Sequence, residues 1–386
     1  MDRPVIGIAL LGSTGSIGRQ TVEVMRAAPD RYELRALASG HADPAFDAQL
    51  DEWPRAMAWC AEGRPAALES DRWAEGGLEQ LATTDGVDLV VVATTGMTAL
   101  PGVLAALGSG RRVALANKEA LVTGGHLVRA ALPSDIEDRL DWLRPVDSEH
   151  SAIWQCLRGE RMHDVARLIL TASGGPFRDR DPADLADVTP AEALAHPTWQ
   201  MGPKITIDSA TLVNKAFEAI EARWLYDLPY PRIAAVLHPG SIVHSLVEFV
   251  DGSYKAQLGL PDMRLPIQYA LSYPDRHPSP ARSAAPEDWA PLTFAPLDPA
   301  RYPAYAAVRD AAEAGGNRGT ILNAADEVAV EAFLAGLLPF PAIASTIGRA
   351  VDRWGSDVEP TIEEITELDA EVRTALRADI GVTVDS

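Results

Sequence analysis

The sequence predicts an α/β protein with an N-terminal Rossmann-like, doubly wound parallel sheet, a central α+β domain and a small C-terminal helical domain. Three observations lead to this prediction. Short apolar strands alternate with helical stretches over residues 1–145, the pattern is mixed over 146–276, and it becomes helical after a proline-rich connection at 277–303. Strand–helix alternation is typical of a parallel sheet with helices on both faces, whereas segregated elements indicate α+β or separate domains.

The strands of the first domain are apolar runs without polar alternation, which is typical of a parallel sheet covered on both faces. A helix is expected directly after the first strand, at 17–25. The expected strands are 5–11, 32–38, 88–93 and 112–116.

The second domain combines strands with a long helix. A hairpin is expected around Asp251-Gly252, because this dipeptide favours a tight turn between two strands. Asp208 and Ser209 are expected to cap a helix that runs from Ala210 to Trp224. The expected strands are 166–171, 233–238, 245–250 and 254–258.

Prolines are dense between Pro274 and Pro303, which excludes a long helix or a central strand there and predicts a connection. The last domain, 304–386, is expected to be helical. Its expected helices are 305–314, 321–334, 342–354 and 361–376.

The composition narrows the range of functions. The 386 residues carry a formal net charge of −21, so the chain should repel nucleic acid and anionic membrane surfaces, and an anionic substrate would need a local site. No stretch approaches the roughly 18 apolar residues of a membrane span. The start lacks a signal-peptide pattern. Cys60 and Cys156 lack the spacing of a disulfide framework or a zinc site. We therefore expect a cytoplasmic protein.

A glycine-rich turn, Gly12-Ser13-Thr14-Gly15-Ser16-Ile17-Gly18, joins the first expected strand to the first helix. Its glycines allow a tight turn and close backbone approach, and the helix N-terminus offers free N–H groups to a pyrophosphate. This placement predicts a dinucleotide site, and the alternative is a Gly/Ser-rich loop without a ligand.

The end of the second strand bears on the choice of cofactor. NAD enzymes usually carry an acid there for the ribose hydroxyls, whereas this chain continues as Ser39-Gly40-His41. The uncharged Ser39 leaves room for a 2′-phosphate that His41 could contact, which favours NADPH. Asp43 lies close by in the sequence, and the alternative for His41 is an exposed loop residue.

Polar residues follow another strand at Asn117-Lys118-Glu119. Ligands bind at the C-terminal ends of the strands in open α/β sheets, so we expect Asn117 near the nicotinamide amide or ribose and Lys118 near a substrate oxygen. The alternative is a solvated turn with a surface ion pair.

Asp147 and Glu149 are two residues apart, and on an extended segment both side chains would point to one face. Two crowded carboxylates repel each other unless a cation neutralises them, and hard oxygen ligands suit Mg²⁺ or Mn²⁺. The pair therefore predicts a metal site, and the alternative is an acidic surface pair.

Two further segments carry groups suited to a phosphate. Ser173 stands before two glycines, which predicts an anion-binding nest or, alternatively, an ordinary Gly-Pro turn. Asn214, Lys215 and Glu218 share one side of the expected helix. Ser209, Asn214 and Lys215 would donate to the phosphate, while Glu218 would supply a third carboxylate or, alternatively, form a surface pair with Lys215.

The segment 196–203 is bounded by proline and glycine and holds Trp199, and it is expected to form a lid over the site. Core packing is the alternative for Trp199.

Taken together, these segments resemble the 1-deoxy-D-xylulose 5-phosphate reductoisomerase family along essentially the whole chain. Many matching motifs in one order are far more specific than any single motif. The matching stretches are 12–18, 117–119, 146–150, 173–178, 196–197, 199–202, 208–211, 214–215 with Glu218, 221–225, 238–239, 257–259, 261–264 and 322–325.

The resemblance implies a homodimeric enzyme that converts 1-deoxy-D-xylulose 5-phosphate, a small sugar phosphate, to 2-C-methyl-D-erythritol 4-phosphate in isoprenoid precursor synthesis. A metal-promoted rearrangement, by a retro-aldol/aldol route or a ketol shift, would precede hydride transfer from NADPH. By position, the metal ligands would be Asp147, Glu149 and Glu218, and the phosphate site would be Ser173, Ser209, Asn214 and Lys215. The remaining substrate contacts would be Lys118, Ser148, Glu149, His196 and Glu218. The NADPH contacts would be Thr14, Gly15, Ser16, Ile17, Asn117, Glu119 and Gly202, to which the end of the second strand adds Gly40 and His41.

The catalytic residues would be Lys118, Glu149, His196 and Trp199. One departure from the family is Gly40-His41-Ala42, where Gly-Lys-Asn is common, so the contact with the 2′-phosphate is altered. Two other functions remain open at this point, a homoserine- or semialdehyde-type dehydrogenase and a non-catalytic NADP(H)-binding protein.

Overall fold

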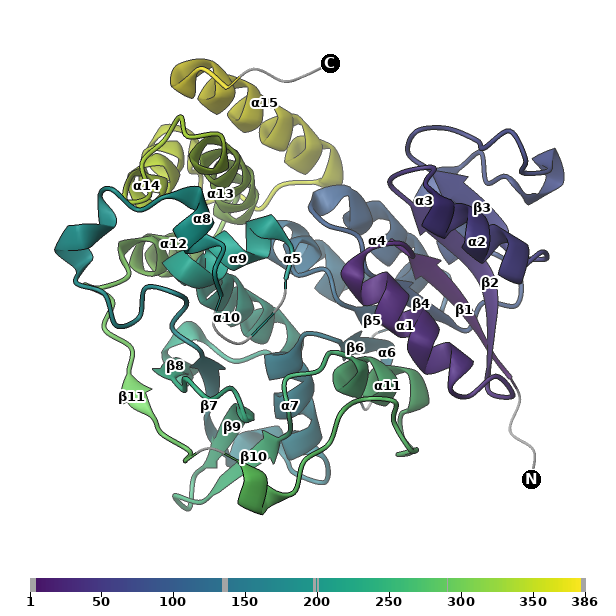
Figure 1. Cartoon of the computed structure of the whole chain (residues 1–386), viewed down its shortest axis with the longest axis horizontal. Helices are drawn as coiled ribbons and strands as arrows, with labels where there is room; N and C mark the ends of the chain where they lie inside the picture. Colours follow the sequence, from purple (N-terminus) through teal and green to yellow (C-terminus); the bar gives the residue numbers. More distant parts are fainter. Residues whose placement is uncertain (1–4, 134–137, 197–198, 200, 290, 383–386) are drawn as a thin grey trace. The chain divides into compact units, whose positions relative to one another are not determined.

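The computed structural model describes residues 5–133, 138–196, 199, 201–289 and 291–382, and Figure 1 shows the course of the chain through them. The chain folds into two compact units, each built from several stretches of sequence. Unit 1 consists of Met1–Ala120, Leu127–Trp154 and Asp262–Ser283, and unit 2 of Leu121–His126, Gln155–Pro261 and Ala284–Ser386.

Unit 1 is built around a six-stranded parallel sheet with the order β3-β2-β1-β4-β5-β6. The strand order reverses between β1 and β4, which is the arrangement of a doubly wound sheet. The prediction of a Rossmann-like N-terminal domain is therefore confirmed. The strands are β1 (Ile6–Leu11), β2 (Tyr32–Ser39), β3 (Met57–Cys60), β4 (Leu89–Val92), β5 (Arg112–Leu115) and β6 (Leu143–Pro145).

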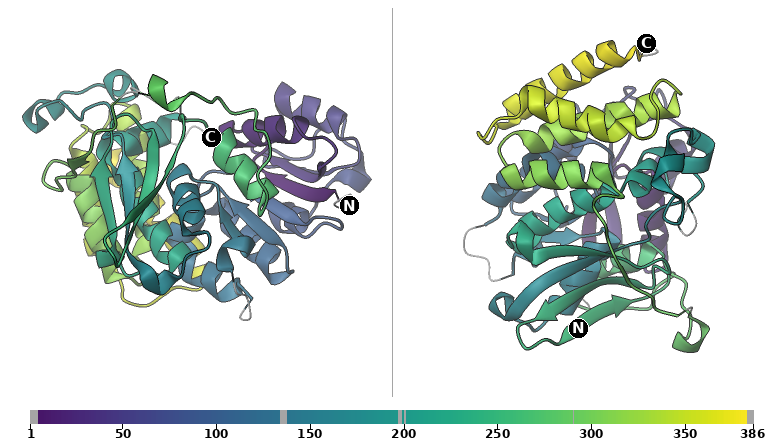
Figure 2. Two further views of the ribbon diagram at one scale, coloured as in Figure 1. Left: turned by 90° about the horizontal axis from the view of Figure 1, so that it is seen from below. Right: turned by 90° about the vertical axis from the view of Figure 1, so that its left-hand side faces the viewer.

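Helices cover both faces of this sheet, as the left view of Figure 2 shows. α1 packs against α11, and α3 packs against α4. Every residue of β4 is at most 2% exposed, which explains why the strand lacks polar alternation. The helices of this unit are α1 (Ser16–Arg26), α2 (Pro44–Glu52), α3 (Gly77–Ala82), α4 (Leu100–Gly108), α6 (Arg139–Trp142) and α11 (Arg264–Ser272), while α5 (Glu119–Ala131) and α7 (Ser148–Leu157) contain residues of both units.

Unit 2 has a mixed five-stranded sheet with the order β10-β9-β7-β8-β11. β7 and β8 are parallel, and the other neighbouring pairs are antiparallel. The predicted hairpin is confirmed, with Asp251 and Gly252 in its turn. The strands are β7 (Val165–Ala172), β8 (Ile233–Leu237), β9 (Val243–Phe249), β10 (Tyr254–Leu258) and β11 (Ala295–Pro296).

The C-terminal helices share one hydrophobic core with the helices of the middle of the chain. α13 packs against α14 and α15, and it also contacts α9. The four helices predicted after residue 304 all form, with bounds that differ by a few residues at most. The helices of unit 2 are α8 (Pro190–Ala193), α9 (Pro203–Thr211), α10 (Val213–Tyr226), α12 (Pro303–Ala314), α13 (Arg318–Leu334), α14 (Ala342–Trp354) and α15 (Ile362–Ile380).

The two units do not follow the predicted borders at 145, 276 and 303. α11 packs against α1, β5 and β6 in unit 1, although it lies more than a hundred residues beyond them in the sequence. The C-terminal helices belong to unit 2 because their apolar faces are buried in its common core.

The predicted helix from Ala210 to Trp224 is wrong in its first turn. Two helices, α9 and α10, meet at Leu212, whose backbone is left-handed with φ of 58°. Asp208 and Ser209 therefore lie in the last turn of α9 and do not cap the following helix. The short strands β3 and β6 were not predicted, because runs of three or four residues give little periodic signal.

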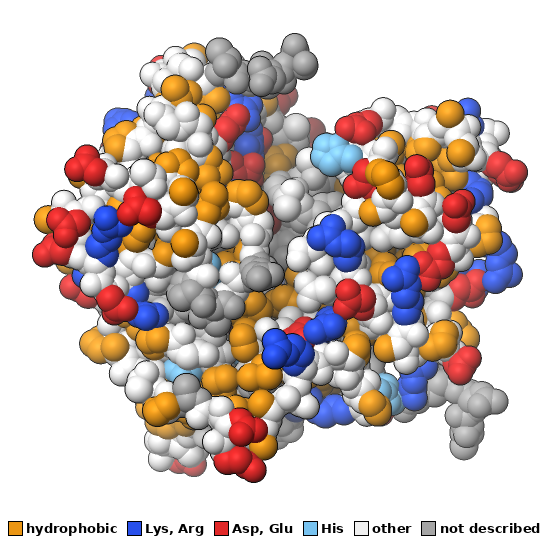
Figure 3. Space-filling model, viewed as in Figure 1, with side chains coloured by type: hydrophobic (Ala, Val, Ile, Leu, Met, Phe, Trp, Pro, Cys, Tyr) orange, Lys and Arg blue, Asp and Glu red, His pale blue; other side chains and the backbone are white. Residues whose placement is uncertain are grey.

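No helix within the described part of the chain is both long and apolar enough to cross a membrane. On the face seen in Figure 3, acidic and basic side chains lie interspersed.

Candidate functional site

The glycine turn of unit 1 is fixed by backbone contacts. The N–H groups of Gly12 and Ser13 donate to the carbonyl of Ala38, at 3.0 and 2.7 Å. Gly12 has a φ of +91°, and a Cβ on Gly18 would lie 2.1 Å from the Gly12 carbonyl oxygen. Both positions therefore require glycine, as expected for a turn that brings backbone close to a ligand.

The turn leads directly into the N-terminus of α1. Gly15 is the N-cap, and among the described residues no side chain caps this end. Ser16 and Ile17 form the first turn, while the Thr14 hydroxyl lies 2.8 Å from that of Ser39 at the end of β2. The first N–H groups of a helix lack partners within it, so this end is suited to an anion such as a pyrophosphate.

Asn117 is almost completely buried at the end of β5. Its side-chain amide donates to the carbonyls of Thr94 and Gly96 at 2.9 and 2.8 Å, and its oxygen accepts from the N–H of Ala120. The amide thus joins the loops that follow β4 and β5. A contact between Asn117 and the nicotinamide stays a prediction. A contact between NADPH and Glu119, the first residue of α5, also stays a prediction.

Asp147 lies directly before α7, so the expectation of an extended segment is wrong. One Asp147 carboxylate oxygen accepts from the backbone N–H of Glu149 at 3.2 Å, and the Asp147 carbonyl accepts from that of Ser151 at 2.8 Å. The other carboxylate oxygen lies 3.0 Å from Nζ of Lys118. Ser148 and Glu149 begin the helix, and the Ser148 hydroxyl donates to the Glu149 carboxylate.

Glu218 on α10 is a buried carboxylate with only 1% of its surface exposed. The Asn214 amide donates to one of its oxygens at 2.6 Å, and the Lys215 ammonium pairs with the other. The three side chains share one side of the helix, as the sequence spacing predicts, but the pair of Lys215 and Glu218 is buried and not a surface pair.

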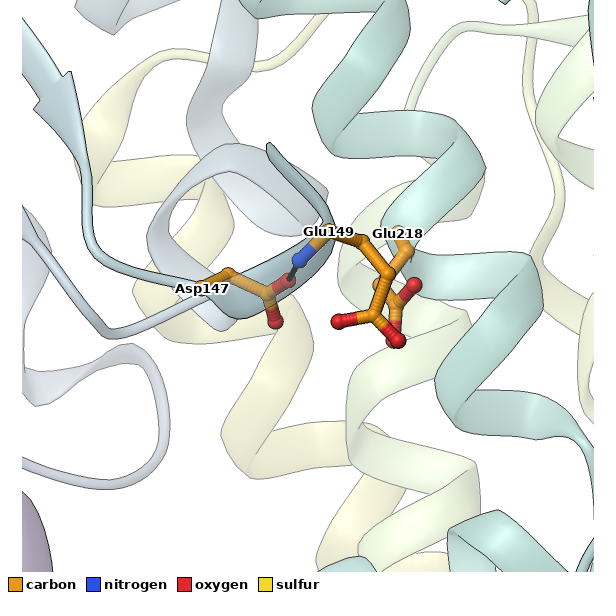
Figure 4. Close-up of side chains that lie close together, drawn as sticks. All are labelled: Asp147, Glu149 and Glu218. Carbon is orange, nitrogen blue, oxygen red and sulfur yellow. Dashed lines mark hydrogen bonds between the residues drawn. The ribbon is translucent and has the colours of Figure 1, made fainter. Parts of the chain in front are cut away.

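The three acids of the predicted metal set lie close together. Asp147, Glu149 and Glu218 each offer a carboxylate oxygen, and these oxygens all lie within 4.8 Å of one another (Figure 4). Carboxylate oxygens at this spacing match the hard ligands that Mg²⁺ and Mn²⁺ prefer. The donor set therefore fits a divalent cation.

A second cluster, the serine–histidine cluster, consists of Ser173, His196 and Ser209 in unit 2. Nε2 of His196 lies 3.1 Å from the hydroxyl oxygen of each serine. Gly174 and Gly175, directly after Ser173, have φ of +87° and +70°. Consecutive N–H groups in such a turn form a nest that favours anions.

The ring of His196 has a defined proton arrangement. Its Nδ1 accepts the backbone N–H of Trp199 at 2.9 Å, so in the neutral ring the proton sits on Nε2, which faces the two serines. Burial lowers the pKa of His196 below its ordinary value of 6.5, and the positive charge of Arg178 lowers it further. The ring is therefore neutral at pH 7, with Nε2 as a donor.

Arg178, the last residue of the matching stretch 173–178, was not among the predicted site residues. Nη1 of Arg178 donates to the Ser173 carbonyl at 2.7 Å, and the side chain packs over Gly174. A cation two residues after a Gly-Gly-Pro turn was the available signal. The guanidinium adds positive charge beside the nest.

The predicted lid lies only partly within the described residues. Residues 197, 198 and 200 lie outside them, so the lid stays a prediction. Trp199 is partly buried, with its ring centroid 6.4 Å from that of His244. Gly202 is the N-cap of α9.

A cluster of one lysine and two buried acids, Lys204, Asp208 and Asp326, was also not predicted. Nζ of Lys204 lies 2.6 Å from Asp208 and 2.7 Å from Asp326, which is completely buried on α13. These contacts join the first turn of α9 to the C-terminal helices.

The doubly wound sheet, its glycine turn and the three converging carboxylates define a dinucleotide-binding α/β protein of the metal-dependent oxidoreductase class. Family models for 1-deoxy-D-xylulose 5-phosphate reductoisomerase match residues 8–125, and models for its C-terminal domains match residues 143–226 and 258–375. The chain belongs to the 1-deoxy-D-xylulose 5-phosphate reductoisomerase family.

Similar proteins support this membership over the full length. The reductoisomerase of Thermomicrobium roseum is 49% identical, covering 97% of this chain and 98% of its own, and that of Geobacillus kaustophilus is 48% identical, covering 96% and 98%. A crystal structure of a reductoisomerase in complex with NADPH, fosmidomycin and magnesium has a TM-score of 0.88 at 35% identity, covering 98% of this chain and 99% of that one. The Zymomonas mobilis enzyme in complex with NADPH has a TM-score of 0.83 at 34% identity, covering 98% and 100%.

Proposed function

We propose that this chain converts 1-deoxy-D-xylulose 5-phosphate to 2-C-methyl-D-erythritol 4-phosphate with NADPH and a divalent cation. The observation that carries the proposal is the convergence of Asp147, Glu149 and Glu218 in a chain that resembles this family throughout. The related structures with NADPH, fosmidomycin and magnesium support the same cofactor and cation for this chain.

The three carboxylates would hold Mg²⁺ or Mn²⁺, which when bound supplies Lewis-acid polarisation of the substrate's carbonyl and hydroxyl oxygens. Lys118 and Lys215 contribute here by charge. Each pairs with one of the acids, and so the two ammonium groups offset much of the repulsion between Asp147 and Glu218.

The phosphate end of the substrate would bind at the serine–histidine cluster and the start of α10. Ser173, Ser209, Asn214 and Lys215 would donate to its oxygens, and the neutral His196 would donate from Nε2. Binding energy obtained there orients the substrate without acting on the reacting carbons. Ser148, at the start of α7, would contact the rest of the substrate.

NADPH would lie over the glycine turn, with its pyrophosphate at the N-terminus of α1, and it supplies the hydride when bound. Thr14, Gly15, Ser16 and Ile17 would contact it from that turn. Trp199 would cover the sugar and exclude water from the reaction.

The experiment that tests the proposal follows NADPH absorbance with 1-deoxy-D-xylulose 5-phosphate, with and without Mn²⁺. We expect NADPH oxidation only with both sugar phosphate and metal. A homoserine- or semialdehyde-type dehydrogenase would be insensitive to EDTA, and a non-catalytic binding protein would oxidise no NADPH. The full-length matches to reductoisomerases do not favour either alternative.

The metal assignment is tested separately with Glu149→Gln, which keeps the size of the side chain but removes its charge. We expect at least about a hundredfold loss of turnover and weaker Mn²⁺ binding by titration calorimetry, because a ligand is lost. Glu359→Gln, an exposed acid, is the matched control and should keep wild-type values. Normal turnover of Glu149→Gln would disprove the assignment.

We also propose that the chain acts as a homodimer in the cytoplasm. The first part rests on the family resemblance, and light scattering of the purified protein tests it. The second is supported by the two buried, free thiols of Cys60 and Cys156, which suit a reducing compartment.

A further inference from the structure

The inference concerns the surface just beyond the ends of β2 and β3 in unit 1. These strands are parallel neighbours, with Ser39 paired to Cys60. The segments that leave them, 40–42 and 61–62, therefore start side by side, and the N–H of Ala61 donates to the Ser39 carbonyl at 3.1 Å. This is the region where Rossmann folds read the 2′ position of the adenosine ribose.

An acid lies in this region, but it comes from β3 and not from β2. One carboxylate oxygen of Glu62 lies 2.8 Å from Nδ1 of His41, and the other accepts the backbone N–H of Ala42 at 3.0 Å. The carboxylate thus engages two donors of the loop after β2. Both side chains are largely exposed, at 78% for His41 and 55% for Glu62, so a ligand can reach them.

The neighbouring acid, Asp43, has a different partner. The Asp43 carboxylate accepts the N–H of Phe46 at 2.8 Å and caps α2. Ser39 is also engaged, since its hydroxyl donates to the His41 carbonyl. Ser39 and Asp43 therefore hold both ends of the loop by contacts that do not involve Glu62.

The pKa directions agree with a formed ion pair. The hydrogen bond with Glu62 raises the pKa of His41, and its charge and that of Asp43 raise it further. The hydrogen bond with His41 lowers the pKa of Glu62, and that with the Ala42 N–H adds to this.

We propose that Glu62 sets the preference of this chain between NADPH and NADH. Its carboxylate occupies the donors, His41 and the Ala42 N–H, that a 2′-phosphate would use, and it repels that dianion. The same carboxylate can accept a hydrogen bond from the free 2′-hydroxyl of NADH. The chain should therefore discriminate less strongly for NADPH than it would with an uncharged residue at position 62. This inference rests on the proposed function for the identity of the cofactors.

The test compares wild type with Glu62→Gln, which removes the charge and keeps the side-chain volume. Dissociation constants for NADPH and NADH are measured by nucleotide fluorescence without sugar phosphate, and kcat/KM is then measured for each nucleotide with 1-deoxy-D-xylulose 5-phosphate and Mn²⁺. We expect the preference for NADPH over NADH to rise about fivefold in both measurements, as removal of one charge beside a dianion at a solvated site predicts. Glu62→Ala should move the ratio in the same direction.

Asp51→Asn is the matched control, because it removes the same charge from the far end of α2, about 12 Å along the helix from its N-cap. It should leave the ratio unchanged. An unchanged ratio in Glu62→Gln, with normal turnover, would overturn this inference and leave the proposed function intact. A shifted ratio of the NADPH and NADH dissociation constants in Glu62→Gln, with no turnover by either wild type or variant, would support this inference and contradict the proposed function.

Discussion

The glycine turn of unit 1 and the serine–histidine cluster of unit 2 are both suited to phosphate, but they are built in opposite ways. The first is one continuous segment, Gly12–Gly18, in which a backbone turn leads into the uncapped N-terminus of α1. The second collects side chains from three segments, with Ser173 and Ser209 each in contact with His196. A backbone site depends on the absence of side chains, whereas a side-chain site depends on the contacts that orient each group.

The largest effect is expected for Gly18→Ala in the glycine turn. In Gly18→Ala the new Cβ would lie 2.1 Å from the Gly12 carbonyl oxygen, so the turn must deform. We expect a loss of about 3 kcal/mol in the free energy of unfolding, measured in urea, and loss of NADPH binding by fluorescence. Gly15→Ala is the matched control, because its Cβ would be 3.4 Å from the same oxygen, and it should unfold within about 1 kcal/mol of wild type. Equal stability of the two variants would show that close approach is not what the turn requires.

Gly175→Ala tests whether close backbone approach is also required at the serine–histidine cluster. Its φ is +70°, and its Cβ would lie 2.6 Å from the Ser209 carbonyl oxygen, so the substitution should displace the nest from the end of α9. We expect about a tenfold higher KM for the sugar phosphate with an unchanged dissociation constant for NADPH. Gly348→Ala in α14, where nothing lies within 4 Å of the new Cβ, should change neither value. A weaker affinity for NADPH in Gly175→Ala would contradict the separation of the two sites.

The serines test whether the side-chain site acts as a unit. Ser209→Ala and Ser173→Ala each remove a hydroxyl that faces Nε2 of His196, and each should raise KM about tenfold, the worth of one hydrogen bond of about 1.4 kcal/mol. Because both contact the same ring nitrogen, the double variant should raise KM by less than the product of the two effects. Independent, multiplicative effects would mean that His196 does not link them.

The smallest expected effect concerns pH. The pKa of His196 is lowered in the folded chain, so between that value and 6.5 the unfolded chain binds more protons. The contribution of the neutral ring to stability is therefore complete above about pH 6.5 and is lost as the pH falls through the folded pKa. Urea midpoints measured from pH 8 to pH 5 should fall further in wild type than in His196→Gln. Parallel curves for the two proteins would argue against a neutral, buried ring.

The same contrast explains how much could be predicted from sequence. The glycine turn, β1 and β2 were predicted correctly because the signal is local, a run of apolar residues followed by glycines. The strands of the hairpin, β9 and β10, were found for the same reason. The contact between Ser173, His196 and Ser209 has no local signal. Residue patterns indicated a phosphate role for Ser173 and Ser209 separately, and the resemblance to a family added His196 to the substrate contacts.

The errors arose where tertiary contacts override local pattern. A continuous helix over 210–224 fits the periodicity, but Leu212 adopts a left-handed backbone and divides it. Asp147 and Glu149 appeared as an extended pair because spacing alone does not show that Asp147 accepts the Glu149 N–H at a helix start. Glu62 was not considered, since its partner His41 is adjacent only through the pairing of β2 with β3.

The interruption at Leu212 has a consequence for charge. An uninterrupted helix from Pro203 to Tyr226 would have its positive dipole end only at Pro203, far from Asn214 and Lys215. By restarting the helix at Val213, the chain creates a second positive end in the first turn that carries these two side chains. One leucine in an unfavourable conformation, at a cost of about 1–2 kcal/mol, thus adds a fixed partial positive charge to a strongly acidic protein at the place where we propose that the phosphate of the substrate binds.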